Sequence, residues 1–268
     1  MVRYQIDGGI TVTQSWSGNL VYNATATVTF LPVTVTNGNH SFKAWTSNPN
    51  GGADQVTSND TLTKAFSVGP GATLPFLQAF EATTFPPVKW SLVNSDNGIT
   101  WARKTATGNG ASTAAAYMNF YNYNSVGQLD DLITEPIDLT SVTDAEMTFN
   151  VAYRRYDNTT DDGLKIFVST DCGVTFSTTP IYNKAGAALA TTTNSTSAFT
   201  PSLASQWRND TVDLGAYVGN SIILKFQAIN DYGNNLYIDD INIYSTSQPP
   251  VAAFSADPTV NCTGVVTF

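Results

Sequence analysis

The sequence has little charge and almost no histidine or cysteine. Charged residues make up 12% of its 268 positions, about half of the quarter that is usual in soluble domains. Acidic residues number 21 against 12 Lys and Arg, which gives a net charge of -9. An acidic chain disfavours binding to nucleic-acid backbones and to anionic lipid surfaces, and it favours cations.

Catalytic constellations are also scarce. His40 is the sole histidine, and no G-x-S-x-G, H-E-x-x-H or phosphate-binding glycine loop occurs. A serine or cysteine triad needs a histidine beside a nucleophile, and a catalytic zinc site usually needs two. We therefore expect no enzyme and interpret His40 as a surface strand residue. A carboxylate pair for glycoside hydrolysis remains open, because 21 acidic residues produce chance pairs.

Three further absences concern the setting of the chain. No run of 18 apolar residues occurs, so we expect no membrane insertion. Two cysteines, Cys172 and Cys262, form no disulfide framework, although a single long-range bridge stays open. A strand-like segment follows Met1 directly, without a signal peptide, so we expect a segment of a longer exported protein.

The residues that are present predict strands. Alternating Val, Ile, Thr, Tyr and Phe recur between clusters of Gly, Asn, Asp and Pro, as in 145–156 and 221–230. No 3.6-residue apolar period extends over eleven residues, and 112–120 is left as strand or turn. Two segments rich in Pro and Gly or Ser, 68–76 and 245–258, divide the chain into domains 1–70, 71–246 and 247–268.

Six motifs in the middle domain occur in a recognisable order: AFEATTFPPVKW, DNGITWARK, GQLDDLITEPIDL, LKIFVSTDCGVTF, QWRNDTVDLGAYVG and YGNNLYIDDINI. In this order they resemble the cleaved-adhesin and MAM-like jelly-roll modules of bacterial secreted proteins, also called the choice-of-anchor J type. The resemblance implies an all-β fold, a two-sheet antiparallel jelly-roll sandwich. Residues 1–70 resemble a partial immunoglobulin-like domain, and 247–268 resemble the truncated start of a PKD-type domain. This context implies type IX export and an extracellular or bacterial cell-surface location.

Two adjacent carboxylates, Asp239 and Asp240, stand in the middle of a predicted strand. The resemblance implies a structural calcium where the first and last strands of the module meet, with Glu81 and one or both of these residues as ligands. Calcium takes six to eight oxygen ligands. Asp96 and Asp130 are further candidate ligands. The alternatives are an Asp pair that caps a strand end, and a plain Asp-Asn-Gly turn at Asp96.

Aromatic residues, 12% of the chain, suggest a binding surface. Tyr117, Tyr121 and Tyr123 are expected on one face of a strand, where alternating Tyr and Asn would suit a sugar. Alternatively, these rings pack in the sandwich core or at its rim. Arg154 belongs to a cationic pair that could contact an acidic ligand or lie at a solvated strand end.

Two local predictions complete the pattern. Residues 157–162 contain three Asp but lack the spacing of an EF-hand, so we expect a solvated hairpin loop. Cys172 is expected in a tight turn without a chemical role, because no base or cation is close to it in sequence.

The sequence as a whole indicates a non-catalytic accessory region for adhesion or substrate targeting, stabilised by calcium. The expected partners are an extracellular glycan, a matrix protein or the catalytic domain of the parent protein. Two alternatives stay open. One is a jelly-roll enzyme of the glycosidase or lyase type, and the other is a pure spacer of a secreted metallopeptidase.

Overall fold

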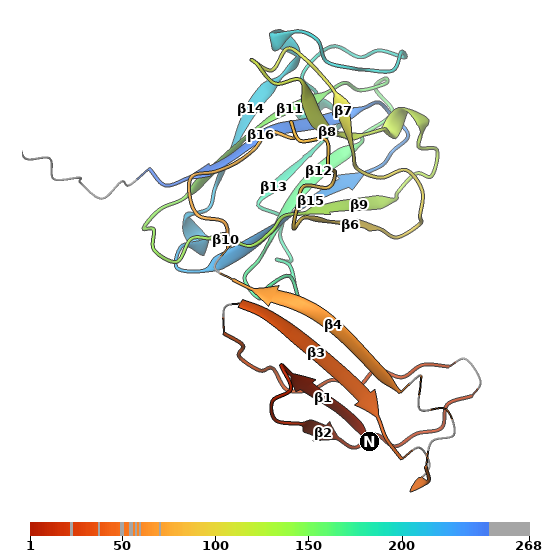
Figure 1. Ribbon diagram of the computed structural model, residues 1–268. Helices are drawn as coiled ribbons and strands as arrows, with labels where there is room; N and C mark the ends of the chain where they lie inside the picture. Colours follow the sequence, from red (N-terminus) through yellow and green to blue (C-terminus); the bar gives the residue numbers. More distant parts are fainter. Residues whose placement is uncertain are drawn as a thin grey trace, which may run out of the picture. The chain divides into compact units, whose positions relative to one another are not determined.

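The computed structural model describes residues 1–21, 24–36, 38–48, 51–53, 56, 58, 60–69 and 71–246 (Figure 1). The chain divides into two compact units, Met1–Pro70 and Gly71 onward. The predicted PKD-like segment, 247–268, lies outside the described residues. Within the described ranges, no helix is long and apolar enough to cross a membrane.

The first unit is a four-stranded antiparallel sheet in the order β2-β1-β3-β4. Its strands are β1 (Val2–Ile6), β2 (Val12–Gln14), β3 (Gly38–Thr46) and β4 (Thr61–Val68). Tyr4 of β1 is buried, with its ring 4.8 Å from that of Phe30 and 5.6 Å from that of Phe42. One aromatic cluster thus packs this small sheet. The immunoglobulin-like assignment stays a prediction.

His40 lies on β3, as predicted, but its side chain is only 8% exposed. Its Nδ1 is 2.6 Å from Asp7 Oδ2 and its Nε2 is 2.7 Å from the carbonyl oxygen of Thr36. The backbone N–H of Ser41 donates to Asp7 Oδ1. The hydrogen bond with Asp7 raises the pKa of His40 above 6.5, and the same bond lowers the pKa of Asp7 below 3.8.

This pair predicts a pH dependence that the single histidine makes easy to follow. The protonated His40 contributes its full stabilisation below pH 6.5, and this contribution is lost as the pH rises through the raised pKa of the folded state. The lowered pKa of Asp7 means that its carboxylate contributes its full stabilisation above pH 3.8 and loses it as the pH falls through the lowered value. The contact therefore contributes most between these values. NMR titration of the imidazole should give a pKa above 6.5, and Asp7→Asn should return it toward 6.5. Asp60→Asn, in the same unit, should leave it raised. A wild-type pKa at or below 6.5 would contradict the contact.

The second unit contains two antiparallel sheets of six strands each. The first sheet has the order β13-β12-β15-β9-β6, with β10 beside β15. Its strands are β6 (Ser91–Asn94), β9 (Leu129–Ile133), β10 (Ile137–Asp138), β12 (Gly163–Ser169), β13 (Tyr182–Ala185) and β15 (Ser221–Ile229). The second sheet has the order β14-β11-β16-β8-β7, with β5 beside β16. Its strands are β5 (Phe76–Gln78), β7 (Ala102–Thr105), β8 (Ala114–Met118), β11 (Glu146–Tyr153), β14 (Arg208–Asp213) and β16 (Leu236–Tyr244).

Between residues 71 and 246, helical structure is limited to single turns: η3 (Phe120–Asn122), α1 (Gly186–Leu189), η4 (Ala204–Gln206) and η5 (Gly215–Tyr217). The prediction of an all-β antiparallel sandwich is therefore confirmed. The segment 112–120, left open between strand and turn, is both: β8 ends at Met118 and η3 follows. Cys172 has φ 62° and is exposed, as a residue in a tight turn should be.

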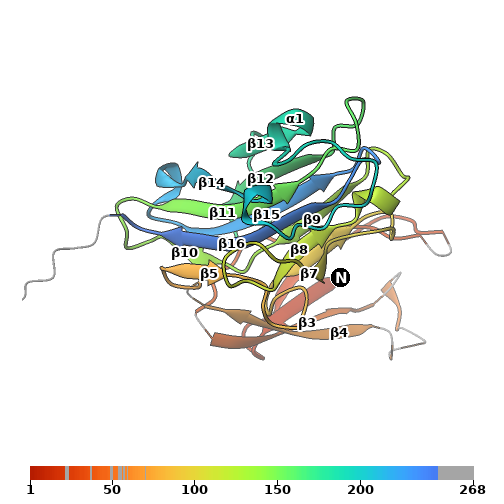
Figure 2. The same ribbon diagram turned by 90° about the horizontal axis from the view of Figure 1, so that it is seen from above.

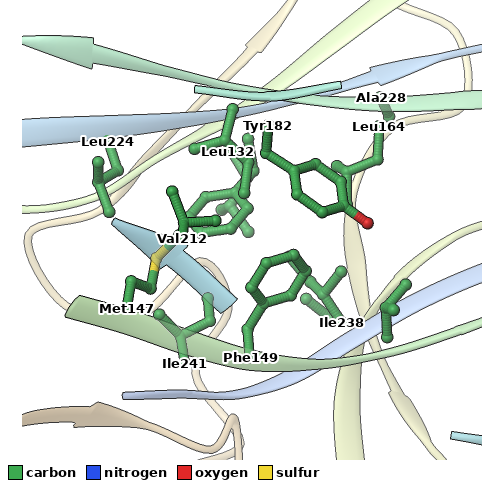
Figure 3. Packing of buried hydrophobic residues seen from close by; sticks show 14 of the residues in the cluster. Leu132, Met147, Phe149, Leu164, Tyr182, Val212, Leu224, Ala228, Ile238 and Ile241 are labelled. Carbon is green, nitrogen blue, oxygen red and sulfur yellow. The ribbon is translucent and has the colours of Figure 1, made fainter. Parts of the chain in front are cut away.

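The core lies between the two sheets (Figure 3). Phe149 of β11 points at the opposite sheet, where its ring lies 5.2 Å from that of Tyr182 and 6.1 Å from that of Phe226. Leu132 and Ile238 enter the same layer from opposite sides. Alternation along each strand explains this packing, because every second side chain of a strand faces the partner sheet.

The first and last strands of the second unit are neighbours. β5 pairs antiparallel with β16, with Phe76 opposite Ile243 and Gln78 opposite Ile241. Figure 2 shows β16 between β11 and β8, with β5 alongside. This is the meeting of first and last strands that the resemblance implied, and it brings the segment after Gln78 toward the middle of β16.

Candidate metal and ligand sites

The Asp pair of β16 lies at a β-bulge. The register between β11 and β16 shifts between Thr148 and Asn150, and Asp240 adopts φ 47°. One amide nitrogen, Nδ2 of Asn109, donates to Asp239 Oδ2 and to Asp240 Oδ2, each at 2.8 Å. A regular strand would send the two side chains to opposite faces. The left-handed backbone at Asp240 breaks that alternation, so both carboxylates reach the same amide.

Glu81 joins this pair through Ser112. The Ser112 hydroxyl donates to Glu81 Oε1 at 2.7 Å, and it also helps to lower the pKa of Asp239. Thr113 donates its backbone N–H to Oε1 and its hydroxyl to Oε2 of Glu81. We call Glu81, Asp239 and Asp240 the first carboxylate cluster. The chain fold therefore does bring Glu81 to the Asp pair.

The two ends of this cluster differ electrostatically. Hydroxyl and backbone donors from Thr113 and Ser112 lower the pKa of Glu81 to about 2. Asp239 is 1% exposed, and burial raises its pKa to about 6 against the hydrogen bonds that it accepts. Among the described residues, no ion pair forms with any member of the cluster. The described His, Cys, Asp and Glu side chains also form no group of three or more that could hold one metal ion. The calcium assignment stays a prediction.

Asp96 and Asp130 lie elsewhere. Asp130 is on β9 of the first sheet, directly opposite Asn94 of β6, and is 1% exposed. Asp96 forms the turn that its Asp-Asn-Gly sequence indicates, with Oδ1 accepting from Gly98 N, while Oδ2 accepts from the Tyr123 hydroxyl. Burial raises the pKa of Asp130 to about 6. We call Asp96 and Asp130 the second carboxylate cluster.

The five candidate ligands are thus divided between two places. The clusters belong to different sheets, and the hydrogen bonds described for them share no residue. The expectation that Asp96 and Asp130 complete one shell with Glu81 does not match this placement. The sequence could not show it, because the order of strands within sheets decides which carboxylates meet.

The tyrosines do not share a strand face, so that prediction is wrong. Tyr117, the penultimate residue of β8, packs against Tyr237 at 4.9 Å in a small cluster apart from the main core. Tyr123 is 3% exposed and belongs to the main core. Tyr121 lies in η3, half-buried, with its ring 6.2 Å from that of Tyr156. Because the strand ends at Met118 and a 3-10 turn follows, the period of two does not continue to these residues.

Arg154 is half-buried and lies over an aromatic ring. Its guanidinium carbon is 4.8 Å from the ring centroid of Phe199. This cation–π contact is attractive because the ring face is electron-rich. The solvated strand end considered for Arg154 therefore does not describe it, and its charge already has a partner within the chain.

Asp162 was expected in a solvated loop and is instead fully buried, with 0% exposure. Its carboxylate accepts hydrogen bonds from the backbone N–H groups of Asp231, Gly233 and Asn234 and from the Tyr153 hydroxyl. A Cβ on Gly233 would lie 2.2 Å from Asp162 Oδ2, so only glycine fits there. The Tyr-Gly-Asn-Asn sequence at 232–235 was the signal in the sequence that could have predicted a tight loop able to enclose this carboxylate.

Neither a family model nor a curated protein matches the sequence. Solved structures do match. The K1 cleaved adhesin domain of Lys-gingipain from Porphyromonas gingivalis W83 is 18% identical, with 64% of this chain and 98% of that domain covered at a TM-score of 0.44. The K3 cleaved adhesin domain of the same protein is 19% identical, with 63% of this chain and 98% of that domain covered at a TM-score of 0.46. A CBM27-1 structure from Caldicellulosiruptor saccharolyticus, in complex with mannohexaose, is 12% identical, with 63% of this chain and 96% of that chain covered at a TM-score of 0.43. The matches include the cleaved-adhesin domains that the sequence resemblance named.

Proposed function

We propose that residues 71–246 form a non-catalytic module that binds extracellular glycan on a surface built by its loops. The observation that carries this proposal is a pair of partly exposed tyrosine rings, Tyr121 and Tyr156, held 6.2 Å apart among exposed asparagine amides. The module acts at the cell surface or outside the cell, and it serves adhesion or the targeting of a larger protein.

The loops that carry these rings are tied together. The Tyr121 hydroxyl donates to the Thr196 carbonyl at 3.2 Å, and Asn230 Nδ2 donates to the Tyr123 carbonyl at 2.7 Å. The loop 230–235 is joined in turn to Asp161 by a backbone donor at 2.7 Å. Loops 119–128, 154–162, 194–197 and 230–235 therefore meet at one end of the sandwich. We call their exposed part the loop surface.

The chemistry of the loop surface suits a neutral, hydroxyl-rich ligand. Its exposed or partly exposed polar and aromatic side chains include Asn122, Asn158, Asn194, Tyr121, Tyr156 and Tyr232, and the carboxylate of Asp161 lies on the same loops. An amide side chain offers both donors and an acceptor to sugar hydroxyls, and a tyrosine ring offers a flat apolar face. The hydrogen bond from Tyr121 to Thr196 fixes one ring before a ligand arrives, which reduces the entropy lost on binding.

The state of the acidic residues supports a binding role over catalysis. A glycosidase of the retaining or inverting type needs a carboxylic acid with a raised pKa beside the scissile bond. The described carboxyl groups whose pKa is raised are Asp130, Asp162 and Asp239, and each is at most 1% exposed. A substrate cannot reach a proton on any of them.

We also propose that the first carboxylate cluster holds a structural calcium. The atoms that could coordinate a metal ion in this cluster are all carboxylate oxygens, which fit a hard cation. The buried Asp239 carboxylate has no described ionic partner, so a cation would offset its desolvation. Glu81, Asp239 and Asp240 would be the ligands, and Glu81 would have to move closer to the Asp pair, because the three carboxylates do not form one metal-holding group in the structure. The ion would fasten the segment after β5 to β16.

Binding to a glycan array and affinity electrophoresis test the loop surface. The intact chain should retain a glycan, and Tyr121→Ala and Tyr156→Ala should each weaken binding at least tenfold, about 1.4 kcal/mol, as expected for central aromatic contacts. Trp16→Ala removes an aromatic side chain of the first unit and should leave binding unchanged. Retention of a matrix protein without any glycan would overturn the glycan assignment. Absence of any ligand would favour a spacer.

A further inference from the structure

The first unit contains a segment, residues 24–30, whose backbone has no strand partner. Between β2 and β3 the described residues form no strand, as Figure 1 shows. Ala24 donates its backbone N–H to the Val21 carbonyl at 2.9 Å, and no other bond between backbone groups is described for residues 24–36. The backbone donors and acceptors of this segment are therefore open, whereas those of β1, β3 and β4 are engaged in the sheet.

The side chains of this segment nevertheless alternate as those of a strand do. Ala26 and Val28 line a cavity of about 690 Å³, and Phe30 places its ring 4.8 Å from that of Tyr4. The threonines that alternate with them are exposed. Thr, Val and Phe are also residues that favour strands. The segment thus combines the side-chain pattern of a strand with an unpaired backbone, which is a template for the addition of another strand.

No charge protects this segment from pairing with another chain. From residue 8 to 42 the sequence contains no Asp, Glu, Lys or Arg. By contrast, the two edge strands of the described sheets that are longer than four residues carry charges: β4 has Lys64, and β14 has Arg208 and Asp210. Charged side chains on an edge oppose pairing between chains. On a chain with a net charge of -9, an uncharged segment is a place where two copies meet without repulsion.

The segment is complementary to itself when two copies pair antiparallel with Thr27 opposite Thr27. In that register Ala26 lies opposite Val28 and Ala24 lies opposite Phe30, so a small side chain meets a large one on the apolar face. The other face pairs threonine only with threonine, which is a favourable cross-strand pair. We propose that the chain forms a twofold dimer in which residues 24–30 of one copy pair with the same residues of a second copy.

The dimer gives the glycan-binding role a second copy of the loop surface. Two binding sites on one particle hold a repeating ligand with higher avidity than one site does. This consequence rests on the proposed function, whereas the dimer itself rests only on residues of the first unit. Loss of glycan binding in Tyr121→Ala should therefore leave the dimer intact, and the two proposals fail separately.

Sedimentation velocity of the intact chain over a series of concentrations tests the pairing. The wild type should convert from monomer to dimer as its concentration rises. Thr27→Lys places two ammonium groups opposite each other at the centre of the pair, so it should raise the dissociation constant of the dimer at least about tenfold. Thr27 is exposed, so the melting curve of this variant should match that of the wild type. Thr63→Lys adds the same charge at an exposed position of β4 and should still form the dimer.

A charge-swap experiment tests the register. Thr27→Asp should also weaken the dimer when it is alone, because two carboxylates then lie opposite each other. An equal mixture of Thr27→Asp and Thr27→Lys should recover a dimer that contains one chain of each, since the register brings the opposite charges together. A wild type that stays monomeric throughout the concentration series would overturn the proposal. A dimer that survives Thr27→Lys, or one that is lost only in Thr63→Lys, would also overturn it, because the contact would then lie elsewhere.

Discussion

Replacing Asp162 with alanine is expected to lower the free energy of unfolding of the second unit by at least about 3 kcal/mol. The substitution leaves three backbone N–H groups and the Tyr153 hydroxyl without their acceptor. Each buried unsatisfied donor costs about 1–3 kcal/mol, and water entering the space recovers part of the loss. Calorimetry of the whole chain should show the transition of the second unit at a Tm lower by about 6–12 °C.

Two variants control for this effect. Asp162→Asn keeps the shape and one acceptor oxygen, so its loss should be smaller than that of Asp162→Ala. Asp157→Ala removes a carboxylate of the same loop that accepts hydrogen bonds from its near neighbour Thr159 and is partly exposed to solvent, and it should cost less than about 1 kcal/mol. Equal effects of Asp157→Ala and Asp162→Ala would show that the buried network does not stabilise the loops.

The strands were predictable because their signal is local. Alternating apolar residues in 145–156 and 221–230 correctly predicted β11 and β15. The resemblance also implied that the first and last strands of the module meet, and Phe76 is indeed paired with Ile243. The strand prediction uses the alternation of residues within one segment, and the prediction that the end strands meet uses the motifs along the whole module.

The errors have a common cause, which is that local patterns do not report bulges or strand ends. The bulge at Asp240 turns two carboxylates to one side, although a period of two places them on opposite faces. The 3-10 turn after Met118 likewise separates Tyr117 from Tyr121 and Tyr123. In both places, the backbone follows tertiary packing instead of the side-chain period.

Burial of acidic residues was the second feature that the sequence could not supply. Asp157 and Asp162 belong to one polar loop sequence, yet only Asp162 is enclosed, because the Gly233 loop closes over it. Asp130 and Asp239 are equally buried but lie in different sheets. The sequence therefore identified the carboxylates and could not divide them into two clusters.

Chelation of calcium is expected to lower the Tm of the second unit by about 5–10 °C through the first carboxylate cluster alone, when calcium is present at a hundredfold excess over its Kd. The ion would bind only the folded chain, because Glu81 follows β5 and the Asp pair lies on β16, far apart in the unfolded state. Calorimetry in calcium and in EDTA measures the shift. An Asp130→Asn background removes the other buried carboxylate that the sequence offered as a calcium ligand, so the shift reports on the first carboxylate cluster.

In that background, Glu81→Gln and Asp239→Asn should each abolish most of the remaining difference between calcium and EDTA. Ser112→Ala is a matched control, because it removes a hydrogen bond to Glu81 but no carboxylate. It should lower the Tm in both conditions while preserving the difference between them. A strand end capped only by Asn109 predicts coincident curves in calcium and EDTA, since the amide donates to both Asp residues without an ion. Coincident curves in the Asp130→Asn background would therefore exclude calcium from the first cluster and leave Asn109 as the group that joins the two carboxylates.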